Sequence, residues 1–132
     1  MKRFRPVAQK EAAGGGIACV ASVLGITYGE ALAKLGARSG KNGKAGKPGQ
    51  APSGEALRRV LNEAFKDTGL AYEIDHPFIG DPDGLETGSI VELANGRYLM
   101  RAADGWMDPA GGKIRRQLPA KVGAALVLTP DL

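Results

Sequence analysis

The order of the hydrophobic patterns is what most constrains the fold of this 132-residue chain. Before Gly69 the apolar residues recur at helical spacing, and after it they occur in short runs rich in Val, Leu and Ile that are typical of strands. The length suits a single domain that spans residues 1–132. We therefore expect an α+β fold in which N-terminal helices pack on a C-terminal antiparallel sheet.

Two helices are expected near the N-terminus. Residues 17–24 are small and apolar throughout, as in a short buried helix. Thr27 and Glu30 have the spacing of a capping box for a second helix over 28–35. Gly36 follows this segment and should end the helix, because glycine readily adopts the left-handed conformation of a C-cap.

A third helix should follow a candidate N-cap at Ser53 and end at Gly69. Its apolar residues at helical spacing are Leu57, Val60, Leu61, Ala64 and Phe65. Beyond this helix, strands are expected at 70–74, 89–93, 97–101, around Trp106 and at 124–129. Segments rich in Gly, Asp and Pro lie between these strands and predict turns.

A mobile basic loop is expected over residues 38–52, which contain no apolar residue larger than Ala. Such a segment has few contacts that could offset the entropy lost on ordering it. Its cations are Arg38, Lys41, Lys44 and Lys47, and they suit an acidic protein or a phosphate surface. Contact with nucleic acid is an alternative, although the loop lacks the aromatic residues on which single-stranded bases stack.

The cysteine content and the apolar runs bear on the compartment and on bound groups. The single Cys excludes an internal disulfide framework, and with a single His it cannot supply the usual metal ligands, so we expect no metal and no cofactor. Gln-Lys-Glu at residues 9–11 interrupts the basic N-terminus, so no secretion signal is recognised. The apolar run at 17–26 is shorter than the ~20 residues of a membrane span. We expect a cytoplasmic protein, or one incorporated in a particle, with no membrane span.

Two short motifs carry the functional argument. The first has Gly15 six residues after Gln9, followed by Gly-x-Ala-Cys. The second has Arg97 at the start of an expected strand and Asp108, followed by Pro, eleven residues later. These motifs resemble the active-site segments of papain-like cysteine peptidases, most closely the C39-like group. In that family a Gln precedes the catalytic Cys by six residues, and the Asp of an Asp-Pro segment orients a His at the start of a strand.

The resemblance implies a papain-like fold that has lost its catalysis. Gly15 stands at the nucleophile position and has no side chain that could attack a peptide. Arg97 stands at the base position, and arginine stays protonated at any relevant pH. Gln9 and Asp108 match the oxyanion donor and the residue that orients the base. The implied function is an inactive peptidase-like domain that binds a client peptide or another protein, as a subunit of a bacterial export, secretion or phage assembly.

An active cysteine peptidase or amidase is the alternative, with Cys19 as nucleophile and His76 as base. Cys19 lies about 6 Å further along the helix axis than the expected position, and its apolar neighbours favour a role in the core. His76 precedes a Pro at a strand end, which is typical of a surface residue. Arg97 and Asp108 are expected to form a salt bridge in the former cleft, with contact between Arg97 and a peptide terminus as the alternative.

Overall fold

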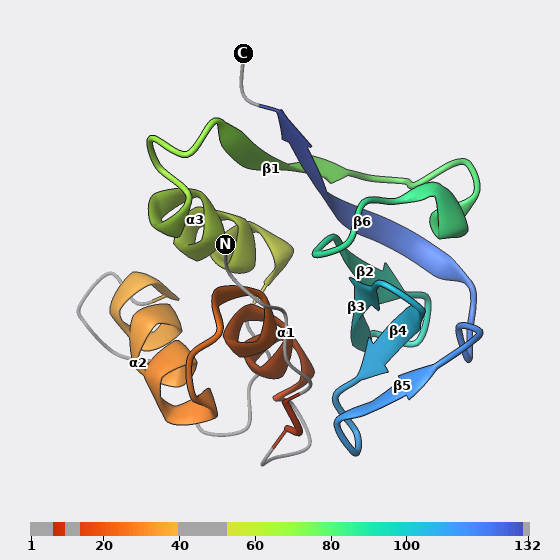
Figure 1. The fold of residues 1–132 in the computed structure, drawn as a ribbon, viewed down its shortest axis with the longest axis horizontal. Coiled ribbons are helices and arrows are strands. Elements are labelled where there is room, and N and C mark those ends of the chain that lie inside the picture. The colour runs from red at the N-terminus through yellow and green to blue at the C-terminus, as the bar shows by residue number, and fades with distance from the viewer. Residues whose placement is uncertain (1–6, 10–13, 40–52, 131–132) are drawn as a thin grey trace.

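The fold of the computed structural model is α+β, with three helices that precede a six-stranded antiparallel sheet (Figure 1). The described residues are 7–9, 14–39 and 53–130. The helices are α1 (Gly15–Leu24), α2 (Tyr28–Ser39) and α3 (Gly54–Ala64). The strands are β1 (Leu70–Asp75), β2 (Ile90–Leu93), β3 (Tyr98–Ala102), β4 (Gly105–Asp108), β5 (Lys113–Arg115) and β6 (Val122–Pro130), with a short 3-10 helix, η1, at Pro82–Gly84. The predicted class and the order of its elements are confirmed.

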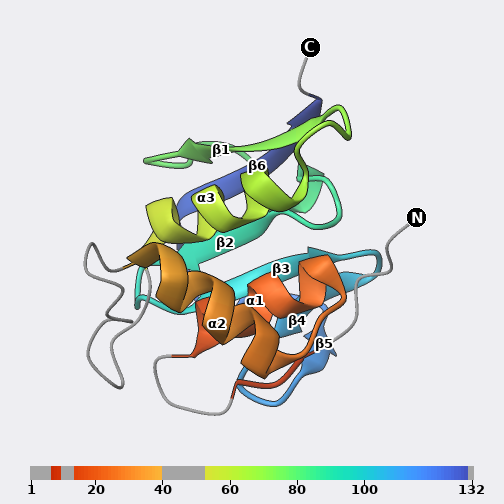
Figure 2. The ribbon, with the colours of Figure 1, turned by 90° about the vertical axis from the view of Figure 1, so that its left-hand side faces the viewer.

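The sheet has the strand order β1-β6-β2-β3-β4-β5, so the last strand in the sequence lies between the first two. The register pairs Tyr72 with Leu128 and Ile90 with Leu126 on the two sides of β6. All three helices lie on one face of the sheet (Figure 2). Helix α1 packs against β3, and α3 packs against β1. This arrangement brings α1 to the middle of the sheet.

Successive side chains along each strand point to opposite faces of the sheet, and the buried side chains of each face form a separate core. On the helical face, the buried strand residues are Tyr72, Ile90, Tyr98, Met100, Met107, Leu126 and Leu128. On the opposite face they are Val91, Leu93, Leu99, Trp106 and Ala125. Loop residues, among them Phe78, Leu85 and Leu118, pack over this second cluster. Because both faces are covered, the central strands are apolar on both sides instead of alternating with polar residues.

The predicted starts of α2 and α3 are confirmed by their caps. The Thr27 Oγ1 accepts a hydrogen bond from Glu30 N at 3.1 Å, and Glu30 Oε1 accepts one from Thr27 N at 2.9 Å. The Ser53 Oγ accepts from Ala56 N at 3.1 Å. Helix α1 starts two residues earlier than predicted, at Gly15. Its N-cap, Gly14, has no side chain that could cap the first turn.

The predicted helix ends at Gly36 and Gly69 are wrong. Helix α2 continues through Gly36 to Ser39, because one glycine inside a helix costs only about 1 kcal/mol and good helix formers follow it. Helix α3 ends at Ala64, and the chain turns through Asp67, whose φ of 66° is left-handed, before Gly69 leads into β1. The predicted loop over 38–52 is wrong at Arg38, which belongs to α2. Residues 40–52, which include Lys41, Lys44 and Lys47, lie outside the described part of the chain.

The predicted strands are all present, with ends that differ by one or two residues. Strand β5 was not predicted, because its exposed residues, Lys113–Arg115, have no apolar alternation. It forms by pairing with β4, with Met107 opposite Ile114. Its formation therefore depends on the β4 partner and not on its own sequence.

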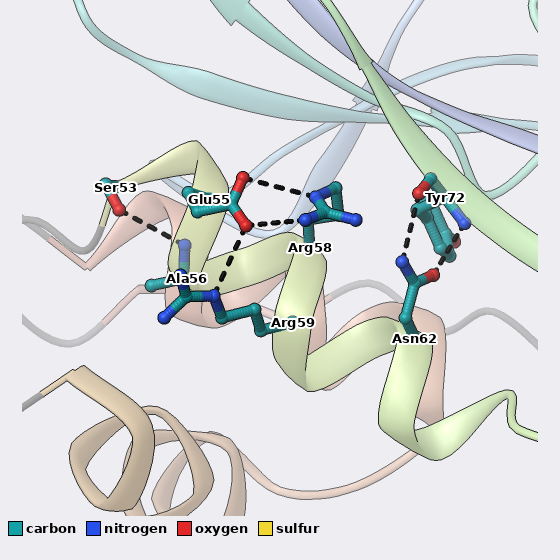
Figure 3. Close-up of polar contacts among 7 residues, drawn as sticks. All are labelled: Ser53, Glu55, Ala56, Arg58, Arg59, Asn62 and Tyr72. Atoms are coloured by element: carbon teal, nitrogen blue, oxygen red, sulfur yellow. Dashed lines mark hydrogen bonds and ion pairs between the residues drawn. The ribbon is translucent and has the colours of Figure 1, made fainter.

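One polar side chain of helix α3, that of Asn62, hydrogen-bonds to the backbone of the edge strand β1 (Figure 3). The Asn62 Nδ2 donates to Tyr72 O at 3.0 Å, and Tyr72 N donates to Asn62 Oδ1 at 2.6 Å. The Tyr72 ring stacks on Phe65, and its hydroxyl donates to Gly88 O at 2.7 Å. The Asn62 amide thus takes the place of a neighbouring strand at β1.

Glu55, on the outer side of α3, binds the guanidinium groups of Arg58 and Arg59.

Candidate functional site

Segments from three parts of the sequence meet at the N-terminus of α1. A Cβ atom placed on Gly15 would lie 3.4 Å from Gln9 Oε1 and 3.7 Å from Tyr98 N. The Gln9 N–H donates to Pro109 O at 2.8 Å, which attaches residue 9 to the segment that follows Asp108. The prediction that the start of the first helix faces the strand beginning near Arg97 is confirmed.

Gly15 occupies a position that could hold a larger side chain. Its φ is not among the positive values, and a Cβ added there would meet its nearest atoms at ordinary van der Waals distances. The neighbouring Gly16 differs, because a Cβ there would lie 3.1 Å from a methyl group of the buried Leu57. The fold therefore requires a small residue at 16 but not at 15, so the glycine at 15 has no steric cause in the described structure.

The N-cap of α1, Gly14, has no side chain that could accept hydrogen bonds from the first turn, and the first turn contains no acidic residue. The N–H groups of a first helical turn have no partner within the helix, and the helix dipole favours negative charge there. The Ala18 N–H is the first to bond within the helix, to Gly14 O at 3.0 Å. An oxygen acceptor therefore suits this helix start, where Gln9 Oε1 would lie 3.4 Å from a Cβ atom on Gly15.

Asp108 holds two arginines beside this helix end. Its Oδ1 accepts hydrogen bonds from Arg97 Nη2 and from Ala110 N, the latter at 2.9 Å. Its Oδ2 accepts from Arg115 Nη1 at 3.0 Å. The Asp108 side chain is 10% exposed, whereas those of Arg97 and Arg115 are 36% and 44% exposed. The predicted salt bridge between Arg97 and Asp108 is confirmed.

The site keeps Asp108 ionised. Burial alone raises the pKa of this carboxyl, but the hydrogen bonds from Ala110 N and Arg115 and the charges of both arginines hold it below its ordinary value. The Arg97 guanidinium has no free lone pair for a proton near neutral pH, and the lowered pKa of Asp108 makes its carboxylate a weak proton acceptor. The arrangement can hold a peptide oxygen by hydrogen bonding, but Arg97 and Asp108 supply no general base.

Arg115 is a member of the site that the sequence motifs did not identify. It lies seven residues after Asp108, on the strand that pairs with β4. The turn from Pro109 to Gly112, in which Gly112 N donates to Asp108 O at 2.8 Å, is the signal that the chain reverses there. Recognition of that turn would have placed the following cations beside β4.

Cys19 and His76 lie in different environments. Cys19 is fully buried in α1, and burial, together with the negative charge of Asp108, raises the pKa of its thiol far above the ordinary value. His76 is exposed and follows the end of β1. No hydrogen bond connects the two in the part of the chain that the structure describes. The predictions of a core cysteine and a surface histidine are confirmed.

The described residues contain no cluster of metal ligands and no helix that could by itself span a membrane. Within 7–9, 14–39 and 53–130, no group of three or more His, Cys, Asp or Glu side chains is arranged to hold a metal ion. No single helix in these ranges is long and apolar enough to cross a membrane. Helix α1 and residues Tyr28–Leu35 meet that requirement only as a pair, and the pair is bent by 110°.

No protein-family model matches the sequence, and no curated protein is similar enough to be matched. The arrangement of Gln9, Gly15, Arg97 and Asp108 is therefore the basis for the proposed function.

Proposed function

We propose that this chain is a catalytically inactive cysteine-peptidase-like domain, of papain-like and C39-like architecture, that binds a protein partner as a subunit of a larger assembly. The observation that carries the proposal is the meeting of Gln9, Gly15 and the start of β3 at one helix N-terminus. In a cysteine peptidase the oxyanion donor, the nucleophile and the strand that bears the base must meet in this way.

Gly15 and Arg97 remove the peptidase chemistry but leave surroundings that could bind a peptide. Gly15 removes the nucleophile, and Arg97 replaces a residue that exchanges protons by one that does not. Asp108 uses one nitrogen of the Arg97 guanidinium, which has further N–H donors and is 36% exposed. A peptide carbonyl or terminal carboxylate at this position would be hydrogen-bonded and would not be attacked.

A blocking substitution tests the proposal. Peptides selected from a randomised library on the immobilised wild-type chain should lose at least about tenfold in affinity for Gly15→Phe, whose ring would occupy the space beside Gln9 and Tyr98. Gly29→Phe is the matched control, because Gly29 is exposed on α2 and a Cβ there would approach only Thr27 Oγ1, at 4.0 Å. Circular dichroism checks that both variants are folded.

Two results would contradict the proposal. One is that no peptide is enriched on the wild-type chain over an unrelated domain. The other is that the selected peptides bind Gly15→Phe as tightly as Gly29→Phe, which would place their site elsewhere on the surface.

A further inference from the structure

A concave site lies on the face of the sheet opposite the helices. Its volume is about 830 Å³, within the range of ligand-binding pockets, and its two walls are the segments 77–83 and 116–123. Figure 1 shows both segments on the side of the sheet away from the helices. None of the residues that line it belongs to the site at the start of α1.

The pocket is preformed by contacts with the sheet. Phe78 N donates to Gly123 O at 3.0 Å, and Ala94 N donates to Lys121 O at 2.7 Å, so both walls are held by backbone hydrogen bonds. Phe78 and Leu118 pack on the buried cluster that contains Trp106. The second core therefore forms the floor of the pocket.

The lining is apolar and incompletely covered. Ile79 is 84% exposed, whereas the other exposed large apolar side chains in the described chain are 38–45% exposed. Pro77, Leu118 and Val122 also line the pocket. An apolar side chain that stands in water beside a cavity gains most from a partner that covers it.

The charged residues of the pocket are mostly cationic. Arg116 and Lys121 line it and are exposed, and neither forms an ion pair with another described residue. Asp83 is the acidic residue among those lining the pocket. Residues 113–121 contain four Lys or Arg and no Asp or Glu, although residues 70–132 carry six cations against nine acids. The positive charge is therefore a local feature of this wall.

We propose that this pocket docks an acidic, apolar peptide segment of a partner protein. A bulky apolar side chain of the segment covers Ile79 and enters between the two walls, and its carboxylates pair with Arg116 and Lys121. Segments 1–6 and 40–52 of this chain each contain three Lys or Arg and no Asp or Glu, so their charge would oppose them as occupants.

A short fluorescein-labelled peptide in which Glu alternates with Leu or Phe is the probe, and its anisotropy is measured as the full chain is added. A second peptide has Lys in place of every Glu. Trp106 is the only tryptophan, and it lies in the cluster on which the pocket walls pack, so its fluorescence provides an independent readout. The acidic peptide should bind and change this fluorescence, and its affinity should fall as salt is added.

Variants locate the site. Ile79→Ser and Lys121→Glu should each weaken binding of the acidic peptide by about tenfold or more. The matched controls are Leu32→Ser, on the exposed side of α2, and Lys113→Glu, a cation of the same segment that does not line the pocket. These controls should bind as the wild type does.

Several results would overturn the proposal. They are equal binding of the Lys-containing peptide, equal losses in Lys113→Glu and Lys121→Glu, or binding of fatty-acid or lipid vesicles in place of both peptides. Gly15→Phe should leave this binding unchanged, so failure of one of the two proposed sites is distinguishable from failure of the other.

Discussion

Replacement of Asp108 by Asn tests whether the ion pairs of the candidate site stabilise the fold. Asn has nearly the same shape, so the substitution changes charge and hydrogen bonding with little change in packing. The carboxylate accepts hydrogen bonds from Arg97, Arg115 and Ala110 N. An Asn side chain retains one acceptor oxygen but turns an NH₂ group toward a guanidinium, which is also a donor.

We expect the variant to lose about 2–3 kcal/mol of unfolding free energy. A hydrogen bond to a charged group contributes about 1.5–3 kcal/mol when it is shielded from water. Arg97 and Arg115 are 36% and 44% exposed, which reduces each contribution toward about 1 kcal/mol. The remainder comes from the amide donor that faces a cation in a largely buried position. For 132 residues, the melting temperature should fall by roughly 6–15 °C.

Urea unfolding at neutral pH, followed by circular dichroism, measures this loss. Asp104→Asn is the matched control, because Asp104 is exposed in a turn and its substitution should change the unfolding free energy by less than about 0.5 kcal/mol. If Asp108→Asn unfolds at the same urea concentration as the wild type, the reasoning is refuted, because solvent would then screen both pairs completely.

The stabilisation by Asp108 should also depend on pH. The pKa of this carboxyl is lowered in the folded state, so its contribution is fully present above the unfolded pKa of about 3.9 and is lost as the pH falls through the folded pKa. The difference in unfolding free energy between the wild type and Asp108→Asn should therefore be constant above about pH 5 and decrease in acid. A difference that increases on acidification would contradict this sign.

Three further predictions concern other parts of the chain. Gly15→Cys alone should cleave no fluorogenic peptide, because Arg97 cannot take the proton of the new thiol; cleavage by this variant would contradict the placement of Arg97 at the base position. Asn62→Ala should lower the unfolding free energy by about 2–3 kcal/mol, measured in urea, because Tyr72 loses both partners of its backbone N–H and C=O; a loss below about 0.5 kcal/mol would show that water replaces the amide. Cys19 should react with iodoacetamide only after unfolding, and rapid labelling of the native protein would revive it as a candidate nucleophile.

Features that depend on neighbouring residues could be predicted from the sequence alone. The capping box of Thr27 and Glu30 and the cap at Ser53 were predictable because each joins residues within one helical turn. The runs of Val, Leu and Ile located most strands, since burial of a strand requires apolar residues whatever its partner is. The motif spacing also predicted that Gly15 and Arg97 approach each other, from the family resemblance and not from physical reasoning.

Contacts between distant segments depend on how the sheet and the helices pack together. Strand β5 and the contact of Arg115 with Asp108 follow from pairing with β4, and β5 itself carries no apolar pattern. The Asn62 amide meets Tyr72 because α3 packs against the edge strand β1. The pocket beside Ile79 exists because β6 lies between β1 and β2, which brings the segments 77–83 and 116–123 together. Hydrophobic periodicity indicates that a residue is buried, whereas the strand order of the folded sheet determines which other residues it contacts.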